Sequence, residues 1–482
     1  MTAVAPRNNV GLILRWLPLV VCGVIAAVTM ALAGHEPSYD PWSWLVWARQ
    51  LSGTSLVSFD SMGASGWKPL PVLVQVPFNW FGPDVAPVVW VWIVRTGTFM
   101  IPVVAWRLGR IAAGYPAAAL AALATLFVPA ATDAAGGLME PLVALFLLIA
   151  VEQAVRGRSG RAWVLGLLAA LGRPEVVAAV APFGVWASVK GRLKWYWVAL
   201  GLPGTTLLWM SGDWIDRGKP FALLARADNS AEPVRIQAAA HPGLEVINNE
   251  VFLLTAFVLA AVAFIAALRW KDEVSRLLGL TVLLIGGATA LATEFGYPAV
   301  PRYLWPMVPI AYALLGIGVG RLVKLVPQVW GKALATIVAG GLLVALLAPL
   351  AIKSDRAGWD WYMGRERATQ DLPNVIASAG GRGWIVTCGS IVVAPSPQVT
   401  AGVYALDVQI TDVARGAIYA VHSWGAPQVV LVQREAIAEL QTAVRQRGLK
   451  ATRLGSSRLW VAYWVGTLKE TPCRRGGLPR LG

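Results

Sequence analysis

The sequence predicts a mostly α-helical, polytopic transmembrane bundle followed by a C-terminal α/β domain outside the membrane. Hydrophobic residues make up 57% of the 482 residues and charged residues only 14%, whereas a typical soluble protein is about 25% charged. Mean hydropathy is +0.60. Roughly nine apolar stretches approach the 20 residues that a spanning helix needs. These features exclude an ordinary soluble protein.

The formal net charge of +15 would suggest a nucleic-acid partner in a soluble chain. In a membrane chain it mainly reports topology, because Lys and Arg accumulate in cytoplasmic loops. We therefore expect no nucleic acid. The three cysteines, Cys22, Cys388 and Cys473, are too few for a disulfide framework, and no Cys/His cluster indicates a structural metal. Whether Cys388 and Cys473 pair stays open.

The nine expected full spans share a nearly uninterrupted apolar composition. They cover 11–33, 85–106, 113–131, 137–155, 195–211, 250–268, 277–293, 303–320 and 333–352. Placing the N-terminus in the cytoplasm makes the cytoplasmic loops short and basic and the outward loops longer and more acidic, as the positive-inside rule requires. The long outward loops indicate that chemistry faces outward.

Residues 162–188 are apolar but are interrupted by Arg173-Pro174-Glu175. The orientation holds only if this segment returns to the side from which it entered, because Lys190, Arg192 and Lys194 belong in the cytoplasm. We therefore predict a re-entrant pair of half-helices broken at Pro174. The pair brings the total to about 11 membrane segments.

Ala31-Leu32-Ala33 resembles a signal-peptidase site. The apolar run before it is longer than a usual signal core, which favours a retained first helix.

Two domains are expected, a membrane domain over 1–352 and a soluble extracytoplasmic α/β domain over 353–482. Short apolar runs predict strands at Trp384–Cys388, Gln428–Gln433 and Arg458–Val465, and an amphipathic pattern predicts a helix at Arg434–Arg447. No nucleotide-binding loop or Ser/His/Asp constellation occurs there. The domain is expected to have a structural or acceptor-binding role.

Asp40 is the leading catalytic candidate. It precedes a proline in the first outward loop, at the start of a short interfacial helix rich in tryptophan. Capping of that helix is one explanation for its position. The other is a general base held at the membrane boundary among aromatic side chains. Glu36, in the same loop, is a weaker second candidate.

Basic residues at the membrane face are candidates for binding a lipid phosphate. Lys68 lies between Trp67 and Pro69 at the expected outer interface and either binds a phosphate or only snorkels toward head groups. Arg173 could form an anion site beside a half-helix N-terminus, or a structural clasp with Glu175. Arg302, which opens a late span, could hold a phosphate oxygen.

The order of these features resembles the GT-C superfamily of membrane glycosyltransferases, which use polyprenyl-phosphate sugars. An acidic residue in the first outer loop is typical of that superfamily, and here it is Asp40 in Ser38-Tyr39-Asp40-Pro41-Trp42. Gly172-Arg173-Pro174-Glu175 resembles the Arg-Pro-Glu turn midway in many members. Arg302-Tyr303-Leu304 resembles the Arg-Tyr-Leu that opens a late helix. The Ala, Arg, Gly and Trp bias fits a high-GC actinobacterial source.

The resemblance implies an inverting hexosyl- or pentosyltransferase of the bacterial plasma membrane and cell envelope. It implies a polyprenyl-phosphate-linked sugar as donor, a lipid, glycan or protein acceptor, and contact with membrane lipid. Asp40 would be the base, Lys68, Arg173 and Arg302 would hold the donor phosphate, and Glu36, Glu175 and Glu294 would support them. Asp40 is followed by proline rather than by a second acidic residue, so no metal site is assigned and a divalent cation stays an open option.

Two other functions compete with the enzyme. A transporter would place its substrate site at the broken helix, but no second broken helix in an internal repeat supports this. A non-catalytic lipid-binding or assembly protein would have kept the fold without the chemistry.

Overall fold

The computed structural model describes residues 9–53, 67–128, 131–217, 235–249, 251–297, 300–327, 329–394, 398–408, 413–414 and 428–469. The chain divides into two compact units. The bundle unit comprises Met1–Ala33, Trp92–Ser211 and Phe221–Gly358. The sheet unit comprises Gly34–Val91, Gly212–Pro220 and Trp359–Gly482.

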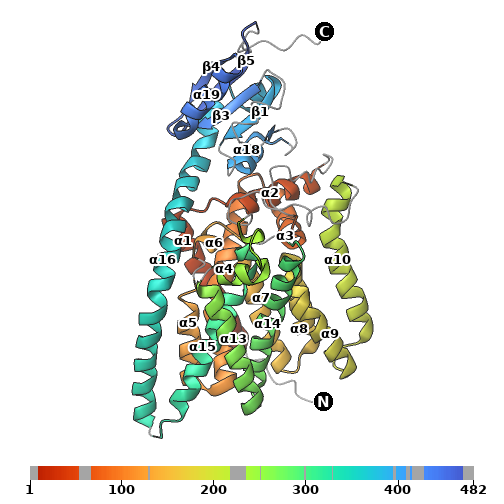
Figure 1. The fold of residues 1–482 in the computed structure, drawn as a ribbon, viewed down its shortest axis with the longest axis vertical. Coiled ribbons are helices and arrows are strands. Elements are labelled where there is room, and N and C mark those ends of the chain that lie inside the picture. Colours follow the sequence, from red (N-terminus) through yellow and green to blue (C-terminus); the bar gives the residue numbers. More distant parts are fainter. Residues whose placement is uncertain are drawn as a thin grey trace. The chain divides into compact units, whose positions relative to one another are not determined.

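The bundle unit is helical, and three of its helices, α4, α10 and α16, continue into residues of the sheet unit (Figure 1). Its described helices are α1 (Asn9–Ala33), α4 (Val85–Ala113), α5 (Tyr115–Thr125), α6 (Ala131–Ala135), α7 (Glu140–Val155), α8 (Ser159–Gly172), α9 (Val177–Val189), α10 (Trp195–Arg217), α12 (Pro242–Asn248), α13 (Val251–Trp270), α14 (Glu273–Glu294), α15 (Met307–Lys324) and α16 (Val329–Ser378). Single 3₁₀ turns lie at η1 (Pro174–Val176) and η2 (Pro301–Leu304).

Six helices within the described residues are long and apolar enough to cross a membrane, and three shorter apolar helices accompany them. The protein is therefore a multi-pass membrane protein. The expected span at 113–131 contains the 11-residue helix α5, which is shorter than the roughly 17 residues of the shortest spanning helices. The total of about 11 membrane segments stays a prediction.

Close packing of α5 and α15 explains why both helices carry small residues. A Cβ atom at Gly316 would lie 2.4 Å from the Cα of Ala121, and one at Gly320 would lie 2.3 Å from the Cα of Ala117. Small side chains allow helix backbones to approach this closely in membranes, where packing rather than hydrophobic burial drives association.

Helices α8 and α9 form an antiparallel hairpin around the break at Pro174 (Figure 1). A Cβ at Gly166 would meet the side chain of Val180 at 2.9 Å, and one at Gly184 would meet the ring of Trp163 at 2.3 Å. Contacts therefore run in opposite directions along the two helices, and the far ends of the hairpin return together. This geometry fits the predicted re-entrant pair, whose orientation in a membrane stays a prediction.

The sheet unit contains a five-stranded sheet in the order β2-β1-β3-β5-β4. Strands β1, β2 and β3 are parallel, whereas β5 runs antiparallel to β3 and β4. Its remaining elements are α2 (Tyr39–Ser52), α3 (Pro69–Asn79), α17 (Arg382–Thr387), β1 (Ser390–Ala394), α18 (Val399–Leu406), β2 (Val413–Ala414), β3 (Gln428–Gln433), η6 (Arg434–Ala436), α19 (Ile437–Gln446), β4 (Leu449–Ser456) and β5 (Trp460–Thr467).

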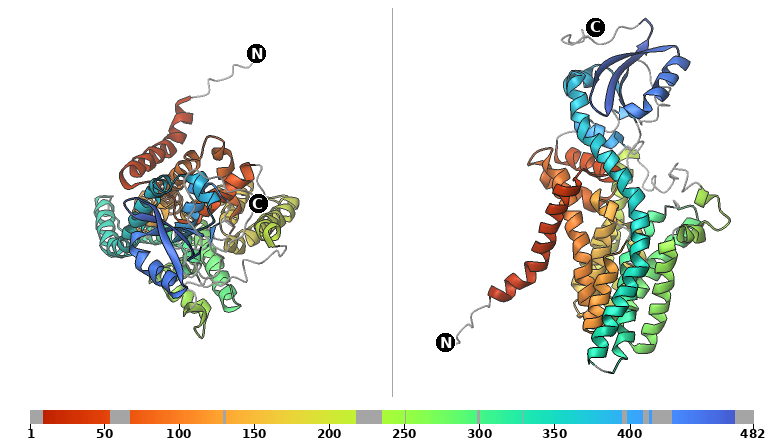
Figure 2. Two further views of the ribbon diagram at one scale, coloured as in Figure 1. Left: turned by 90° about the horizontal axis from the view of Figure 1, so that it is seen from above. Right: turned by 90° about the vertical axis from the view of Figure 1, so that its left-hand side faces the viewer.

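Both faces of the central strands are buried, which explains their continuous apolar sequences. One face packs against α19 (Figure 2), and its core includes Val392, Val430, Val432 and Val461 of the strands with Leu440 and Val444 of the helix. The other face carries the alternate residues, among them Ile391, Val429 and Ala462.

The second face of the sheet shares its core with the first-loop helix α2. Trp42, Leu45 and Val46 of α2 belong to the same buried cluster as Leu372 and Val375 of α16. The sheet unit therefore combines the first loop with the C-terminal region. The division of the chain into 1–352 and 353–482 stays a prediction, and α16 runs without interruption through residue 352.

The strand predicted at Trp384–Cys388 is wrong, because these residues form most of helix α17 and its C-cap. The strand β1 begins at Ser390, directly after Gly389, which has a positive φ of +146° and separates the strand from α17. A short apolar run can be a buried strand or a buried helical turn. Here it is a helical turn, in which Ile385 is fully buried. The strand at Gln428–Gln433 and the following helix are confirmed.

Cysteine chemistry differs between the units. Cys22 is free and buried in the bundle unit, and Cys388 is disulfide-bonded. Cys473 lies outside the described residues.

Candidate functional site

Asp40 lies in the first turn of α2, two residues after the helix N-cap. The N-cap is Ser38, whose side chain makes no capping hydrogen bond. The capping role considered for Asp40 is therefore wrong, because the helix begins one residue before it at Tyr39. A carboxylate in the first turn still interacts favourably with the helix dipole. The Asp40 residue is only 7% exposed.

Arg365 of α16 interacts electrostatically with Asp40. Burial lowers the pKa of Arg365 to about 10, and the charge of Asp40 opposes that shift. At neutral pH the guanidinium stays protonated. Its carbon lies 4.5 Å from the ring centroid of Trp361, which covers the cation with an aromatic face. A buried cation beside a buried carboxylate fixes the position of the carboxylate through their mutual attraction.

Glu36 lies next to a second residue of α16, Glu366. Burial, followed by the charges of Glu366 and Asp84, raises the pKa of Glu36 to about 7. The Oε1 atom of Glu366 accepts hydrogen bonds from the backbone N–H of His35 at 3.1 Å and from Gln370 at 3.0 Å. Consecutive residues of α16, Arg365 and Glu366, therefore interact with the two acidic residues of the first loop.

Gly34 makes room for this arrangement. Its φ is +77°, and a Cβ atom at this position would lie 1.5 Å from Oε1 of Glu366. Only glycine combines that backbone conformation with the close approach of the carboxylate.

Lys68 occupies the N-cap position of α3 and is 6% exposed. Its Nζ atom lies 4.7 Å from the ring centroid of Trp44. Trp44 in turn contacts Trp90 edge to face at 6.0 Å. The aromatic rings thus hold the ammonium group in place, so Lys68 is not a solvated interfacial lysine.

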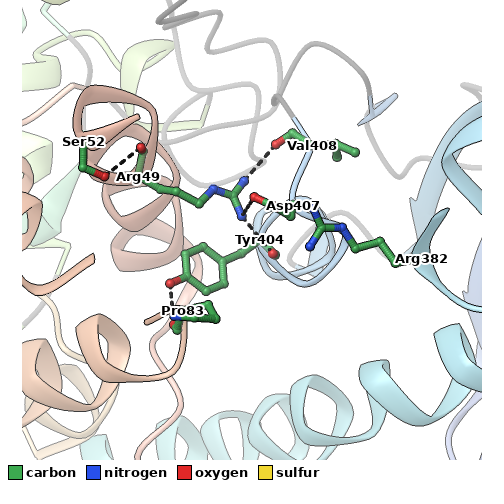
Figure 3. Close-up of polar contacts among 7 residues, drawn as sticks. All are labelled: Arg49, Ser52, Pro83, Arg382, Tyr404, Asp407 and Val408. Atoms are coloured by element: carbon green, nitrogen blue, oxygen red, sulfur yellow. Dashed lines mark hydrogen bonds and ion pairs between the residues drawn. The ribbon is translucent and has the colours of Figure 1, made fainter. Parts of the chain in front are cut away.

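A polar clasp holds α2 on α18 (Figure 3). Arg49 pairs with Asp407 at 3.0 Å and donates hydrogen bonds to the carbonyl oxygens of Tyr404 and Val408. The ring of Tyr404 lies 4.9 Å below the guanidinium carbon, and Arg382 also pairs with Asp407. Together with the shared hydrophobic core, these contacts fix the helix that carries Asp40.

In the bundle unit, Arg173 stands at the centre of a buried ion-pair cluster. Its Nη1 atom lies 3.1 Å from Oε1 of Glu140 and its Nε atom 3.6 Å from Oε2 of Glu175. The guanidinium carbon lies 4.1 Å from the ring centroid of Tyr303. Arg173 is 2% exposed, so its charge is compensated by protein groups on more than one side.

Arg302 belongs to the same cluster but is more accessible. Its Nε atom lies 3.6 Å from Oε1 of Glu140, and 31% of its side chain is exposed. The cluster also includes Tyr297, whose hydroxyl donates to Oε1 of Glu175 at 2.7 Å. Burial, together with the charge of Glu175, raises the pKa of Tyr297 well above its ordinary value, so this hydroxyl remains a donor.

The structure places three of the candidate residues of the bundle unit in one cluster and places the fourth, Glu294, outside it. Arg173, Glu175 and Arg302 lie in one cluster of the bundle unit. Glu294 is occupied elsewhere, because its Oε1 accepts a hydrogen bond from the backbone N–H of Gly243 at 3.0 Å. Asp40, Glu36 and Lys68 belong to the sheet unit.

Residues that the sequence did not single out complete both groups. Arg365 and Glu366 lie far from the first loop in the sequence. They form an Arg-Glu pair in a polar stretch, a pattern too common to indicate a functional site. Tyr297 and Tyr303 flank Arg302, and Tyr303 was visible within the Arg-Tyr-Leu motif. Glu140, the first residue of α7, lies close to both Arg173 and Arg302.

The donor groups of the described residues do not form a metal site. No group of three or more His, Cys, Asp or Glu side chains in that part of the chain could hold a metal ion. The acidic residues found here are instead engaged with arginine, tyrosine or backbone N–H groups.

The fold is similar to those of two solved structures. ArnT from Cupriavidus metallidurans in the apo state is 13% identical, with 92% of this chain and 97% of that chain covered and a TM-score of 0.53. The oligosaccharyltransferase of Archaeoglobus fulgidus, in complex with Zn and sulfate, is 12% identical, with 92% and 72% covered and a TM-score of 0.50. The GT-C fold implied by the sequence resemblance is thereby confirmed.

No protein-family model matches the sequence, and no curated protein matches it.

Proposed function

We propose that the protein is a membrane glycosyltransferase that moves a sugar from a polyprenyl-phosphate donor to an acceptor hydroxyl outside the cytoplasm. The observation that carries this proposal is the buried Asp40 on the first-loop helix of a GT-C fold, beside the buried cation Arg365. General-base activation of a hydroxyl requires a carboxylate held in a fixed position within reach of that hydroxyl.

In the proposed reaction, Asp40 takes the proton of the acceptor hydroxyl as its oxygen attacks the anomeric carbon. The bond from that carbon to the phosphate oxygen breaks, and the lipid phosphate leaves with the bonding electrons. Because the sugar becomes oxocarbenium-like and negative charge collects on the phosphate, fixed cations lower the barrier. A single displacement inverts the configuration at the anomeric carbon.

Two of the three candidate cations suit a direct phosphate contact better than the third. Arg302 is partly exposed, and its Nε atom lies 3.6 Å from Oε1 of Glu140. Lys68 carries its ammonium group 4.7 Å from the ring centroid of Trp44, at the N-terminal end of α3. Arg173 interacts with two carboxylates, so we assign it the role of positioning Glu140 and Arg302 around it.

Residues 353–482 would support Asp40 rather than perform chemistry. The contacts of α2 with α16 and α18 favour this role, since they hold the helix that carries the base. We also propose a bacterial plasma-membrane location with the N-terminus in the cytoplasm and the C-terminal region outside. The acceptor, and whether the sugar is a hexose or a pentose, are for experiment to identify.

A direct test incubates the purified protein with a panel of polyprenyl-phosphate hexoses and pentoses and candidate acceptors, and follows the lipids by mass spectrometry. We expect one donor to be converted to free polyprenyl phosphate, with the sugar recovered on an acceptor in inverted configuration. The broken pair α8–α9 favours transport as the second candidate. Donor flux across proteoliposomes without cleavage would replace the enzyme with a transporter, and binding without either would indicate a lipid-binding protein.

A further inference from the structure

The turn between α9 and α10 concentrates positive charge at one end of the bundle unit. Lys190, Arg192 and Lys194 are exposed, and the sequence contains no acidic residue between Glu175 and Asp213. None of the three forms an ion pair within the described part of the chain. Some other basic side chains of this unit are neutralised: Arg107 and Arg156 both pair with Glu152, and Arg321 pairs with Asp272.

The backbone of this turn is well defined by hydrogen bonds. The N–H groups of Arg192 and Leu193 donate to the carbonyl oxygen of Ala187 at 2.8 and 3.1 Å, and that of Gly191 donates to Ser188 at 2.9 Å. Gly191 has a φ of +66°, which closes the helix end in a conformation that glycine adopts without strain. The three charged side chains therefore project from a fixed frame.

The surface of the turn has a shallow, open hollow of about 410 Å³, lined by Ser188, Gly191, Leu193, Lys194, Trp195 and Tyr196. Sites for small ligands typically have volumes of about 300–1,000 Å³. The wall combines a cation, a hydroxyl and two amphipathic rings. These are the groups that recognise a phosphate attached to an apolar body.

Aromatic side chains surround the cations. The guanidinium carbon of Arg192 lies 5.0 Å from the ring centroid of Trp186, and Nζ of Lys194 lies 5.7 Å from that of Tyr196. Trp195 and Trp197 are 72% and 53% exposed. Tryptophan and tyrosine favour the depth of lipid head groups, so the turn is suited to lie at a membrane interface.

We propose that the α9–α10 turn is a binding site for the phosphodiester head group of an anionic phospholipid. The phosphate would lie among Lys190, Arg192 and Lys194, and the glycerol backbone and upper acyl chain would lie against Trp195 and Tyr196. The leaflet would be the cytoplasmic one if the predicted orientation holds. The site is separate from the proposed glycosyl transfer and does not depend on it.

Native mass spectrometry of the full-length protein, titrated with phosphatidylglycerol or phosphatidylcholine, tests this site. The wild type should prefer phosphatidylglycerol. The variant Lys190→Gln/Arg192→Gln/Lys194→Gln should bind it more weakly by on the order of 100-fold, since each basic residue near a membrane surface contributes about a factor of five. Binding of phosphatidylcholine should change little.

The matched control is Arg110→Gln/Lys324→Gln/Lys332→Gln, which removes the same number of charges from the ends of α4, α15 and α16 in the bundle unit. Its affinity for phosphatidylglycerol should stay within about twofold of wild type. If both triple variants lose the same affinity for phosphatidylglycerol, the loss comes from the change in net charge, and the proposed site is overturned. Displacement of the lipid by inorganic phosphate, at the ionic strength of a chloride control, would assign the turn to free phosphate and overturn a lipid site.

A second variant covers the case in which the triple variant does not fold. Trp195→Ala leaves the net charge unchanged, so unchanged lipid binding in this variant would contradict the proposed role of the aromatic wall. A several-fold loss would support it.

Discussion

At the residue scale, the two arginines of the buried cluster are expected to behave differently. Arg173→Ala leaves Glu140 and Glu175 without their buried cation, which should lower the free energy of unfolding by about 3–5 kcal/mol. Arg302→Ala removes a partly exposed cation and should cost less than about 1 kcal/mol. Arg302→Ala should nevertheless weaken donor binding at least about tenfold, because it removes a charge-assisted contact to phosphate.

Thermal unfolding and donor titration of the purified variants distinguish these roles. Unchanged donor affinity in Arg302→Ala would move the phosphate site away from this cluster. Arg173→Ala with wild-type stability would show that the ion pairs are not structural.

The raised pKa of Glu36 predicts that the stability of the protein depends on pH. Its pKa of about 7 exceeds the ordinary value of 4.5, so between these two pH values the unfolded chain releases a proton that the folded chain retains. Stability from this group is complete below about pH 4.5 and is lost as the pH rises through 7. Glu36→Gln should therefore unfold a few degrees above wild type at pH 8 and close to it at pH 4.5.

The matched control is Glu245→Gln, in an exposed pair with Arg235, whose unfolding temperature should follow wild type at both pH values. If Glu36→Gln shows the same fall in stability between pH 4.5 and 8 as wild type, another group causes the dependence.

At the element scale, the α8–α9 hairpin depends on glycine for close packing. A Cβ at Gly184 would lie 2.3 Å from the ring of Trp163, whereas one at Gly204 of α10 would meet nothing within 4 Å. Gly184→Ala should destabilise by about 1–3 kcal/mol through overpacking. Gly204→Ala should stabilise by about 0.5–1 kcal/mol through helix propensity.

The two glycine variants are compared by thermal unfolding in the same detergent. Equal effects of the two substitutions would contradict the packing described for α8 and α9.

Elements with a strong periodic signal were predictable, and short ones were not. The long apolar helices and the strand Gln428–Gln433 follow from their sequences. Trp384–Cys388 does not, because a five-residue apolar run fits a strand or a helical turn equally well and its surroundings decide. The break at Pro174 was readable because proline removes a backbone donor.

At the scale of the whole molecule, the contacts between distant residues were not predictable from one sequence. Asp40 interacts with Arg365, and Tyr297 binds Glu175. No local pattern records which face of α16 meets the first loop. The candidate residues Asp40, Arg173 and Arg302 could be selected from motifs, but their partners depend on tertiary packing.

The predicted orientation of the chain is testable with two cysteine variants. Ser188→Cys should react with a membrane-impermeant maleimide only from the cytoplasmic side, because the α8–α9 hairpin returns to the side from which it entered. Ser457→Cys, between β4 and β5, should react only from outside. External labelling of Ser188→Cys would contradict the re-entrant arrangement.

The central claim is that Asp40 is the base of a glycosyl transfer. The most direct measurement compares the rate of polyprenyl-phosphate release by wild type, Asp40→Asn and the control Asp84→Asn, a carboxylate of the same unit. We expect Asp40→Asn to lose at least about a hundredfold in rate per folded molecule, the usual minimum for a general base, while the control keeps the rate and the unfolding temperature of wild type. Activity of Asp40→Asn within about tenfold of wild type would contradict the assignment.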